Sequence, residues 1–339
     1  MTQRPTATLP VEAAWARFRN SPGGALLRES LSLRGSYLAS IGVRRLPAEV
    51  TLPGAIPWNL LATAEADARG EEVGPHLSTE GTILAHSVAT WAAYREAKTI
   101  YHVEPLLAEA LAHTPWPEQV PTEALRLPSR CPVLVLPWEG QTLSVSAYYD
   151  LLTSREHTSE LELRLGRLEG GQWAPLSILH LIGEDLGACV RAAGARVERE
   201  GGPAAAFRSD LAGLILTVLL YLAGEPDLVT HVHPGVKPTR EARMQRRDPD
   251  RWKDLRSPAL FAVGTDYRRA IERWEHEQRR TEGEPTGRTV RPHVRRAHAH
   301  LYWTGRGRQV PRVRFLLPIP VKGAPVPDET AAPVQTPIR

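Results

Sequence analysis

The sequence predicts an α+β fold in which helices pack against a central antiparallel sheet. The first observation is a change of period between about residues 130 and 182, where a continuous apolar run at 132–136 is followed by segments with alternating apolar and polar residues, four predicted strands in all. Short links between such segments are typical of an antiparallel meander. The second is the helical spacing of apolar residues on both sides of this region. The third is another alternating stretch, about 296–321, which predicts a β-hairpin that we expect to join the sheet at its edge.

Residues 1–80 form the first predicted unit, an N-terminal segment that is partly helical and partly extended. Residues 11–19 and 26–33 place apolar side chains at helical spacing, and a proline followed by two glycines separates them. The stretch 46–60 is rich in proline, which removes a backbone donor and disfavours helix in the residue before it. We therefore expect an extended connection over 46–60.

Residues 81–320 form the second predicted unit, the α+β core that ends in the basic hairpin. A helix is expected over 79–98, with Val88 and Trp91 on its buried side. A further helix opens at Pro105, because the first helical position does not need the N–H that proline lacks.

More helices are predicted over 184–200, 204–223 and 266–280. The apolar run from 211 to 223 has 13 residues, whereas a membrane span needs roughly 20. We therefore expect this run in the core and no membrane association. The region 231–256 is predicted to be a loop, and the proline-rich tail 321–339 to be disordered.

The charge of the chain is concentrated near its C-terminal end. There are 42 basic and 38 acidic residues, a formal charge of +4. Eight of the arginines lie between residues 288 and 314, a stretch that contains no acidic residue. Without those eight, 34 basic residues face 38 acidic ones and the balance becomes −4. A basic strip this local indicates a partner rather than a requirement of the fold.

The strip has the alternation of a strand, in which successive side chains point to opposite faces. Along the first strand, His298, His300 and Tyr302 share one face, and Leu301 and Trp303 share the other. Glycines in the next few residues supply the positive φ values of a turn. A second strand from about residue 310 continues both faces. The sequence therefore predicts a hairpin with an apolar underside and an upper side of arginine, histidine and tyrosine.

Such an upper side predicts binding to RNA, to a complex of messenger RNA and ribosome, or to another polyanion. Arginine binds phosphate through paired donors, and Tyr302 and Trp303 can stack on bases. The alternatives are a solvated arginine face with Trp303 in the core, or a grip on an acidic protein surface or nascent peptide. The residues expected to contact nucleic acid are Arg291, His293, Arg295, Arg296, His298, His300, Tyr302, Arg306, Arg308, Arg312 and Arg314.

Catalysis is the minority hypothesis. His298 and His300 could act as general base and acid, with Arg296 stabilising the transition state of RNA cleavage. The repeats of a two-histidine phosphoesterase are absent, as are the motifs of nucleotide-binding loops, zinc proteases and kinases. Asp150, at the edge of the meander, is expected to be solvated. We therefore favour a binding protein over a nuclease.

No metal or cofactor is expected. Two H-x-H pairs, at 231–233 and 298–300, have no carboxylate or thiolate nearby in the sequence, and the neighbouring arginines would repel a cation. Cys131 and Cys189 lack C-x-x-C spacing, which argues against a disulfide scaffold or a thiolate zinc site. The first ten residues have no apolar stretch of the secretory kind, so we expect a cytoplasmic protein.

Four blocks of the sequence together resemble a known family. The first contains Trp91, Tyr94, Ala97, Lys98, Ile100 and Tyr101, followed by Glu104, Pro105, Leu106, Leu107 and Leu111. The second contains Val120, Pro121, Ala124, Leu125, Arg126, Leu127, Pro128, Cys131 and Pro132. The third is Leu219, Leu220, Tyr221 and Leu222. The last contains Arg291, Pro292, His293, Arg295, Arg296, His298, His300, Tyr302, Trp303, Gly305, Gly307 and Arg308.

In order and spacing, these blocks resemble the family of the second type V-A anti-CRISPR protein, the AcrVA2-like family, across residues 90–320. The resemblance implies a phage or plasmid protein that represses production of a CRISPR effector nuclease, acting around its messenger RNA during translation. It implies no catalytic residues, and it leaves the target of this chain open.

Overall fold

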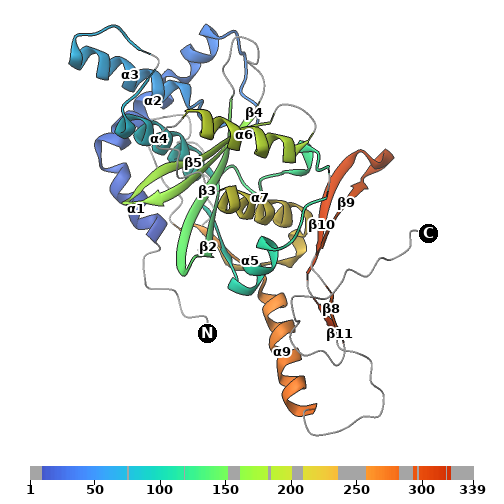
Figure 1. Cartoon of the computed structure of the whole chain (residues 1–339). Coiled ribbons are helices and arrows are strands. Elements are labelled where there is room, and N and C mark those ends of the chain that lie inside the picture. The colour runs from blue at the N-terminus through green and yellow to red at the C-terminus, as the bar shows by residue number, and fades with distance from the viewer. Residues whose placement is uncertain are drawn as a thin grey trace.

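The computed structural model describes residues 10–74, 76–117, 119–151, 161–181, 185–200, 209–235, 257–281, 293–295, 298–317 and 319–321. The helices are α1 (Pro10–Arg19), α2 (Pro22–Ser40), α3 (Ala55–Arg69), α4 (Thr79–Ala97), α5 (Pro105–Ala112), α6 (Leu186–Glu200), α7 (Ser209–Gly224) and α9 (Thr265–Thr281). Helices and strands together form an α+β fold, as predicted (Figure 1).

A seven-stranded sheet lies at the centre, with the strand order β5-β4-β3-β2-β1-β7-β6. Its strands are β1 (Thr99–Val103), β2 (Pro132–Trp138), β3 (Gln141–Leu151), β4 (Leu161–Glu169), β5 (Gln172–His180), β6 (Val229–Pro234) and β7 (Ala259–Val263). Strands β2 to β5 form the predicted antiparallel meander. The sheet as a whole is mixed rather than antiparallel, because β1 runs parallel to both β2 and β7.

Three strands of this sheet were not predicted. Strand β1 is only five residues long and follows α4 at once, after Lys98 turns the chain with a φ of 43°. Strands β6 and β7 are distant in the sequence from β1, and β6 begins at Val229 and runs into the predicted loop 231–256. The expected extended connection over 46–60 is also too long, since α3 already begins at Ala55.

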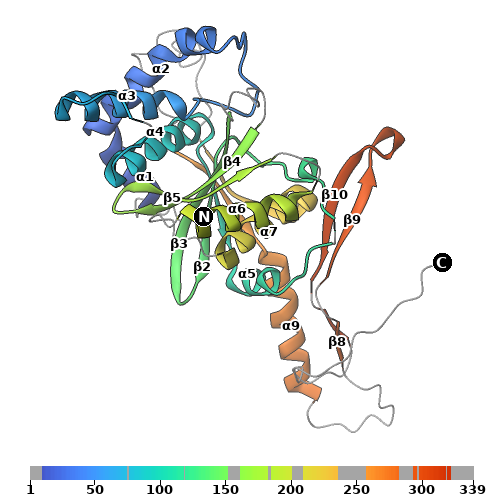
Figure 2. The same ribbon diagram turned by 45° about the horizontal axis from the view of Figure 1, so that its top comes forward.

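Helices cover both faces of the sheet (Figure 2). On one face, α1, α2, α3 and α4 share a core with the sheet in which the Trp91 ring lies 5.4 Å from Trp15 and 5.3 Å from Trp173. On the other, α5, α6 and α7 pack in a second core. The predicted buried side of α4 is confirmed, because Val88 and Trp91 are fully buried.

The apolar patterns correctly predict the buried helix α7 and the C-terminal hairpin, but not the position of the hairpin relative to the central sheet. Helix α7 is buried along its length, and no helix in the described part of the chain is long and apolar enough to cross a membrane. Strands β9 (His298–Thr304) and β10 (Val310–Leu316) form the predicted hairpin. We expected these strands to join the edge of the central sheet, but they form a two-stranded sheet of their own.

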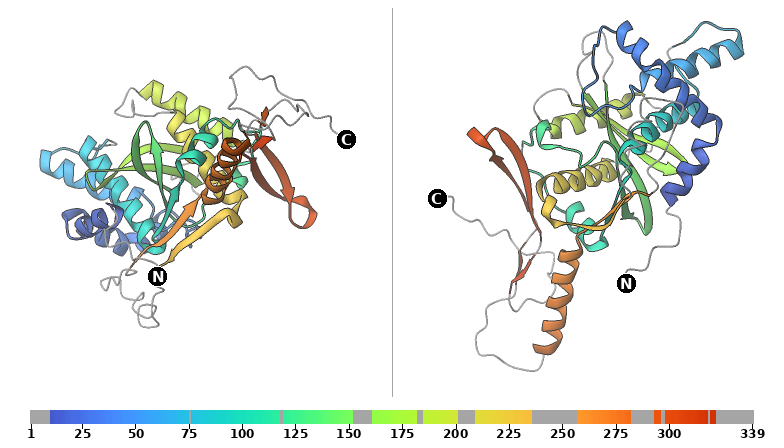
Figure 3. Two further views of the ribbon diagram at one scale, coloured as in Figure 1. Left: turned by 90° about the horizontal axis from the view of Figure 1, so that it is seen from below. Right: turned by 180° about the vertical axis from the view of Figure 1, so that it is seen from behind.

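The hairpin lies beside α7, and its tip points away from the rest of the molecule (Figure 3). A second small ribbon, β8 (His293–Arg295) with β11 (Ile319–Val321), follows at its base. Helix α9 contacts α5 at its start and then extends away from the sheet (Figure 1). The predicted tail lies, from residue 322 on, outside the described residues.

Candidate nucleic-acid interface

The turn of the hairpin forms at the glycines that the sequence analysis predicts for it. Gly305 and Gly307 have φ values of 77° and 72°, a region that glycine enters without steric cost. The hydroxyl of Thr304 donates a hydrogen bond of 3.0 Å to the carbonyl of Val310, which closes the two strands at the turn. Arg306 and the residues around it are therefore exposed at the tip.

The underside of the hairpin attaches it to α7. Val313 and Phe315 are buried, and the Phe315 ring lies 5.9 Å from the Tyr221 ring on the helix. The backbones approach so closely at the end of α7 that a side chain on Gly224 would collide with the carbonyl of Val313. The apolar face thus attaches the hairpin to α7, and the opposite face points outward.

The upper face carries two parallel rows of side chains. On β9, the His298 and His300 ring centroids are 4.8 Å apart, and those of His300 and Tyr302 are 6.1 Å apart. On β10, Arg314 lies opposite His300 and Arg312 lies opposite Tyr302 in the strand register. The predicted upper face of arginine, histidine and tyrosine is therefore present, with aromatic rings on one strand and guanidinium groups on the other.

The positive charge of this face is only slightly compensated. Arg314 Nε lies 3.7 Å from the Glu225 carboxylate at the end of α7. Arg306, Arg308 and Arg312 form no ion pair with any residue that the structure describes. An anion that approaches the face therefore meets three guanidinium groups to which no described carboxylate is bound.

The remaining predicted contacts are only partly placed. His293 and Arg295 lie on β8 at the base of the hairpin, paired in register with Val321 and Ile319. Arg291 and Arg296 lie outside the described residues, and so therefore does one member of the catalytic group expected with His298 and His300.

Trp303 is on the other face, opposite Pro311, and 49% of its surface is exposed. The alternative that places Trp303 in the core is therefore wrong. Trp303 and Tyr302 lie on opposite faces, as predicted, because neighbouring residues of a strand point to opposite sides.

The second histidine pair lies far along the chain, on β6. The His231 ring packs edge-on against Phe261 at 4.4 Å, and the ring of His233 accepts a hydrogen bond from the Gly235 N–H. Within the described ranges, no three histidine, cysteine or acidic side chains come together in an arrangement that could hold a metal ion.

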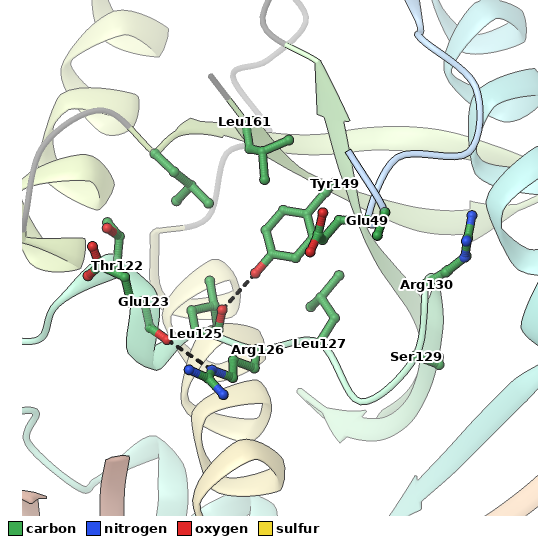
Figure 4. Close-up of a pocket in the computed structure, with 12 residues that line it drawn as sticks. Glu49, Thr122, Glu123, Leu125, Arg126, Leu127, Ser129, Arg130, Tyr149 and Leu161 are labelled. Atoms are coloured by element: carbon green, nitrogen blue, oxygen red, sulfur yellow. Dashed lines mark hydrogen bonds between the residues drawn. The ribbon is translucent and has the colours of Figure 1, made fainter. Parts of the chain in front are cut away.

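An open pocket of about 740 Å³ lies beside the short helical turn 122–124, which lines it (Figure 4) and also contacts β10. Its apolar walls include Leu127 and Tyr149, whose hydroxyl donates a 2.7 Å hydrogen bond to the carbonyl of Leu125. Charged residues of both signs also line it: Glu49, Glu123, Arg126 and Arg130. Sequence reasoning missed this pocket because five separate segments of the chain form it.

A buried ionic cluster lies in the central sheet, formed by Asp150, Glu162 and Arg164. Asp150 is fully buried, so the expectation of a solvated edge residue is wrong. Its carboxylate lies 2.8 Å from Arg164 Nε and accepts a 2.9 Å hydrogen bond from the Gly54 N–H at the start of α3. Burial raises the pKa of Asp150, and the charge of Arg164 offsets part of that rise.

His86 on α4 lies next to this cluster. Its Nδ1 is 3.5 Å from the hydroxyl of Tyr148, and its buried Nε2 has no hydrogen-bond partner among the described residues. Burial, together with the positive charge of Arg164, lowers the pKa of His86 to about 3. The cluster therefore contains groups that hold the sheet and the N-terminal helices together, with Asp150, Glu162 and His86 buried and Arg164 partly exposed.

Comparison with known proteins identifies the family. The family model described as AcrVA2-like, anti-CRISPR type V subtype A2 family, matches residues 101–323, more than half of the chain. The solved structure titled "Crystal structure of AcrVA2" matches with a TM-score of 0.60 and 16% identity, over 93% of this chain and 100% of the other. At this identity the likeness shows a shared fold, and no curated protein matches the chain. The chain belongs to the AcrVA2-like family, the anti-CRISPR type V subtype A2 family.

Proposed function

We propose that the protein is an anti-CRISPR repressor that lowers production of a CRISPR effector by contacting RNA, or a translating messenger RNA complex, through the upper face of its hairpin. Membership of an anti-CRISPR family supports the biological role. The observation that carries the RNA contact is the free guanidinium row: Arg306, Arg308 and Arg312 have no acidic partner in the described part of the chain, and all lie at the tip or on the outward face.

The physical reason is the cost of such an arrangement. Adjacent positive charges repel one another, and a two-stranded ribbon on the surface gains nothing from them unless an anion binds. RNA supplies a regular row of phosphates, and arginine binds each of them with two parallel hydrogen bonds. The contacts of β10 with α7 and with the turn 122–124 involve its apolar face, so the arginines of the tip and the upper face point outward.

The test is the salt dependence of RNA binding by the purified protein. Affinity should fall steeply with salt, because each phosphate contact on a single strand adds about 0.7 to the slope of log affinity against log salt. Changing Arg306, Arg308 and Arg312 to glutamine should reduce that slope by about 2. The matched control is Arg269→Gln with Arg273→Gln on the exposed side of α9, which should leave the slope unchanged.

Absence of any affinity for RNA or DNA at about 50 mM salt would end the proposal. RNA recovered from the binding reactions should also be intact. Cleavage that disappears in both His298→Ala and His300→Ala would instead support the nuclease hypothesis, for which the 4.8 Å separation of the two rings is the favourable observation.

A second candidate function, a protein-binding adaptor, is favoured by the pocket beside the turn 122–124. Its apolar walls with a mixed charged lining suit an apolar side chain flanked by charged residues, as on an acidic protein surface or a nascent peptide. Pull-downs should then recover a protein partner after RNase treatment. Leu127→Glu, which puts a charge on the pocket wall, should abolish that recovery, and the triple arginine variant of the hairpin should not.

A further inference from the structure

The two rows on the upper face have a spacing that selects among forms of nucleic acid. The ring centroids of His298 and His300 are 4.8 Å apart with their planes at 88°, and those of His300 and Tyr302 are 6.1 Å apart with their planes at 64°. Stacked bases in a helix are parallel and recur every about 3.4 Å along each strand. A helical strand therefore cannot place one base flat against each ring of His298, His300 and Tyr302. An extended strand with its bases splayed apart can, because each base then takes its own tilt and spacing.

The cross-strand register places cations where the phosphates of such a strand would run. Arg312 lies opposite Tyr302, and Arg314 lies opposite His300. Neighbouring strands are about 4.8 Å apart, so a base above a ring on β9 leaves its phosphate near the guanidinium of β10. Arg312 has no ion pair among the described residues, whereas Arg314 is shared with Glu225, so Arg312 is the stronger phosphate contact.

We propose that this face binds single-stranded, unstacked RNA, with one base on each of the three rings and the phosphates on Arg312 and Arg314. This inference rests on the proposed function and names the form of RNA that the hairpin takes. Base-on-ring stacking tolerates any sequence, since every base has a flat face. The hairpin therefore selects an open single strand rather than a sequence, and it rejects duplexes.

The same hairpin provides an internal control. Tyr302 and Trp303 are neighbours on β9 with similar exposure, 46% and 49%, but they point to opposite faces. Truncation of either removes an exposed aromatic ring from the same strand. Only Tyr302 belongs to the proposed ladder, so the two variants separate stacking from a general effect on the ribbon.

The experiment compares three ligands with the same number of phosphates: a single-stranded RNA, an abasic strand without bases, and a duplex. The wild-type protein should bind the single strand about tenfold or more tightly than the abasic strand. Tyr302→Ala should remove most of that preference and leave affinity for the abasic strand unchanged. Tyr302→Phe should keep the preference, because it retains the ring, and Trp303→Ala should behave as wild type.

The possible failures are distinguishable. Equal affinity for all three ligands, with Tyr302→Ala neutral and the triple arginine variant still weakened, would overturn the stacking ladder and leave the proposed function standing. Tighter binding to the duplex than to the single strand would overturn the ladder in the same way. No binding to any of the three ligands would overturn both. Circular dichroism of each variant shows whether it is folded, and a half-exposed tyrosine is not expected to matter for folding.

Discussion

Arginine has opposite roles in the hairpin and in the buried ionic cluster. Arg164 lies between two buried carboxylates, those of Asp150 and Glu162, so its charge is fully used inside the fold. Arg312 lies on an outward face with no acidic partner among the described residues. A buried charge must be paired where it is, because removal from water is costly. An outward-facing charge without a partner remains available to a ligand, so pairing rather than residue type separates these two kinds of arginine.

The largest effect is expected from breaking the buried pairing. Arg164→Met leaves two carboxylates without their cation and should lower the free energy of unfolding by about 3–5 kcal/mol. Denaturant unfolding measures this. The control is Arg167→Met on the same strand, since Arg167 is more exposed and pairs with the exposed Glu169. Its effect should stay within about 1 kcal/mol, and an equal loss in both variants would refute the role of the cluster.

The next effect tests how the hairpin is held. Gly224→Ala adds a methyl group where the carbonyl of Val313 already lies, so the hairpin must shift from α7. We expect a loss of up to about 3 kcal/mol and faster amide exchange in β10. Gly213→Ala, on the same helix, meets nothing within 4 Å and should be stabilising by about 0.5–1 kcal/mol. An equal change in stability in the two variants would contradict the close contact between Gly224 and the carbonyl of Val313.

A smaller effect concerns pH and the histidine beside the cluster. The pKa of His86 is about 3 in the folded protein and 6.5 as its ordinary value. Between these two values the unfolded chain binds a proton that the folded protein does not, so stability falls as pH falls below about 6.5. At pH 5 this one group lowers the free energy of unfolding by about 2 kcal/mol, and at pH 8 it has no effect.

His86→Gln should therefore reduce the difference in stability between pH 8 and pH 5 by about that amount. Thermal unfolding at the two values measures it, and the loss of packing in the variant cancels because it is present at both. An unchanged difference would mean that His86 takes up its proton in the folded state as readily as in the unfolded chain.

The smallest effect on stability is expected from the hairpin arginines, which have no ion pair in the described part of the fold. The glutamine changes at Arg306, Arg308 and Arg312, which should weaken RNA binding, should alter the free energy of unfolding by no more than about 0.5 kcal/mol. These side chains contribute no ion pair to the described fold. A clear loss of stability would show that the hairpin charges stabilise the fold. They would then not differ in role from Arg164.

Local patterns predicted much of the fold because they depend on neighbours in the sequence. Alternation located the meander and the hairpin, and helical spacing located α4 and α7. The short strand β1 was missed because five residues carry little periodicity, and its neighbours β2 and β7 are distant in the sequence. Parallel pairing of this kind is set by tertiary contacts that no local pattern records.

The same difference between local patterns and tertiary contacts applies to the candidate site. Alternation correctly put His300 and Tyr302 on one face and Val313 on the other, since a strand fixes this locally. It did not reveal that Asp150 is buried against Arg164, because that pairing depends on adjacent strands and on the start of α3. The pocket was invisible for the same reason, as it brings together segments around residues 49, 125, 149, 161 and 181.

The attachment of the hairpin through one apolar face has a consequence for how the protein can change over generations. The residues that hold the ribbon, such as Val313 and Phe315, alternate with those that face outward, such as Arg312 and Arg314. Mutations at the outward positions leave the apolar contact with α7 untouched. Selection can therefore alter the outward face in single steps without passing through unfolded intermediates, a useful property for any protein whose target also evolves.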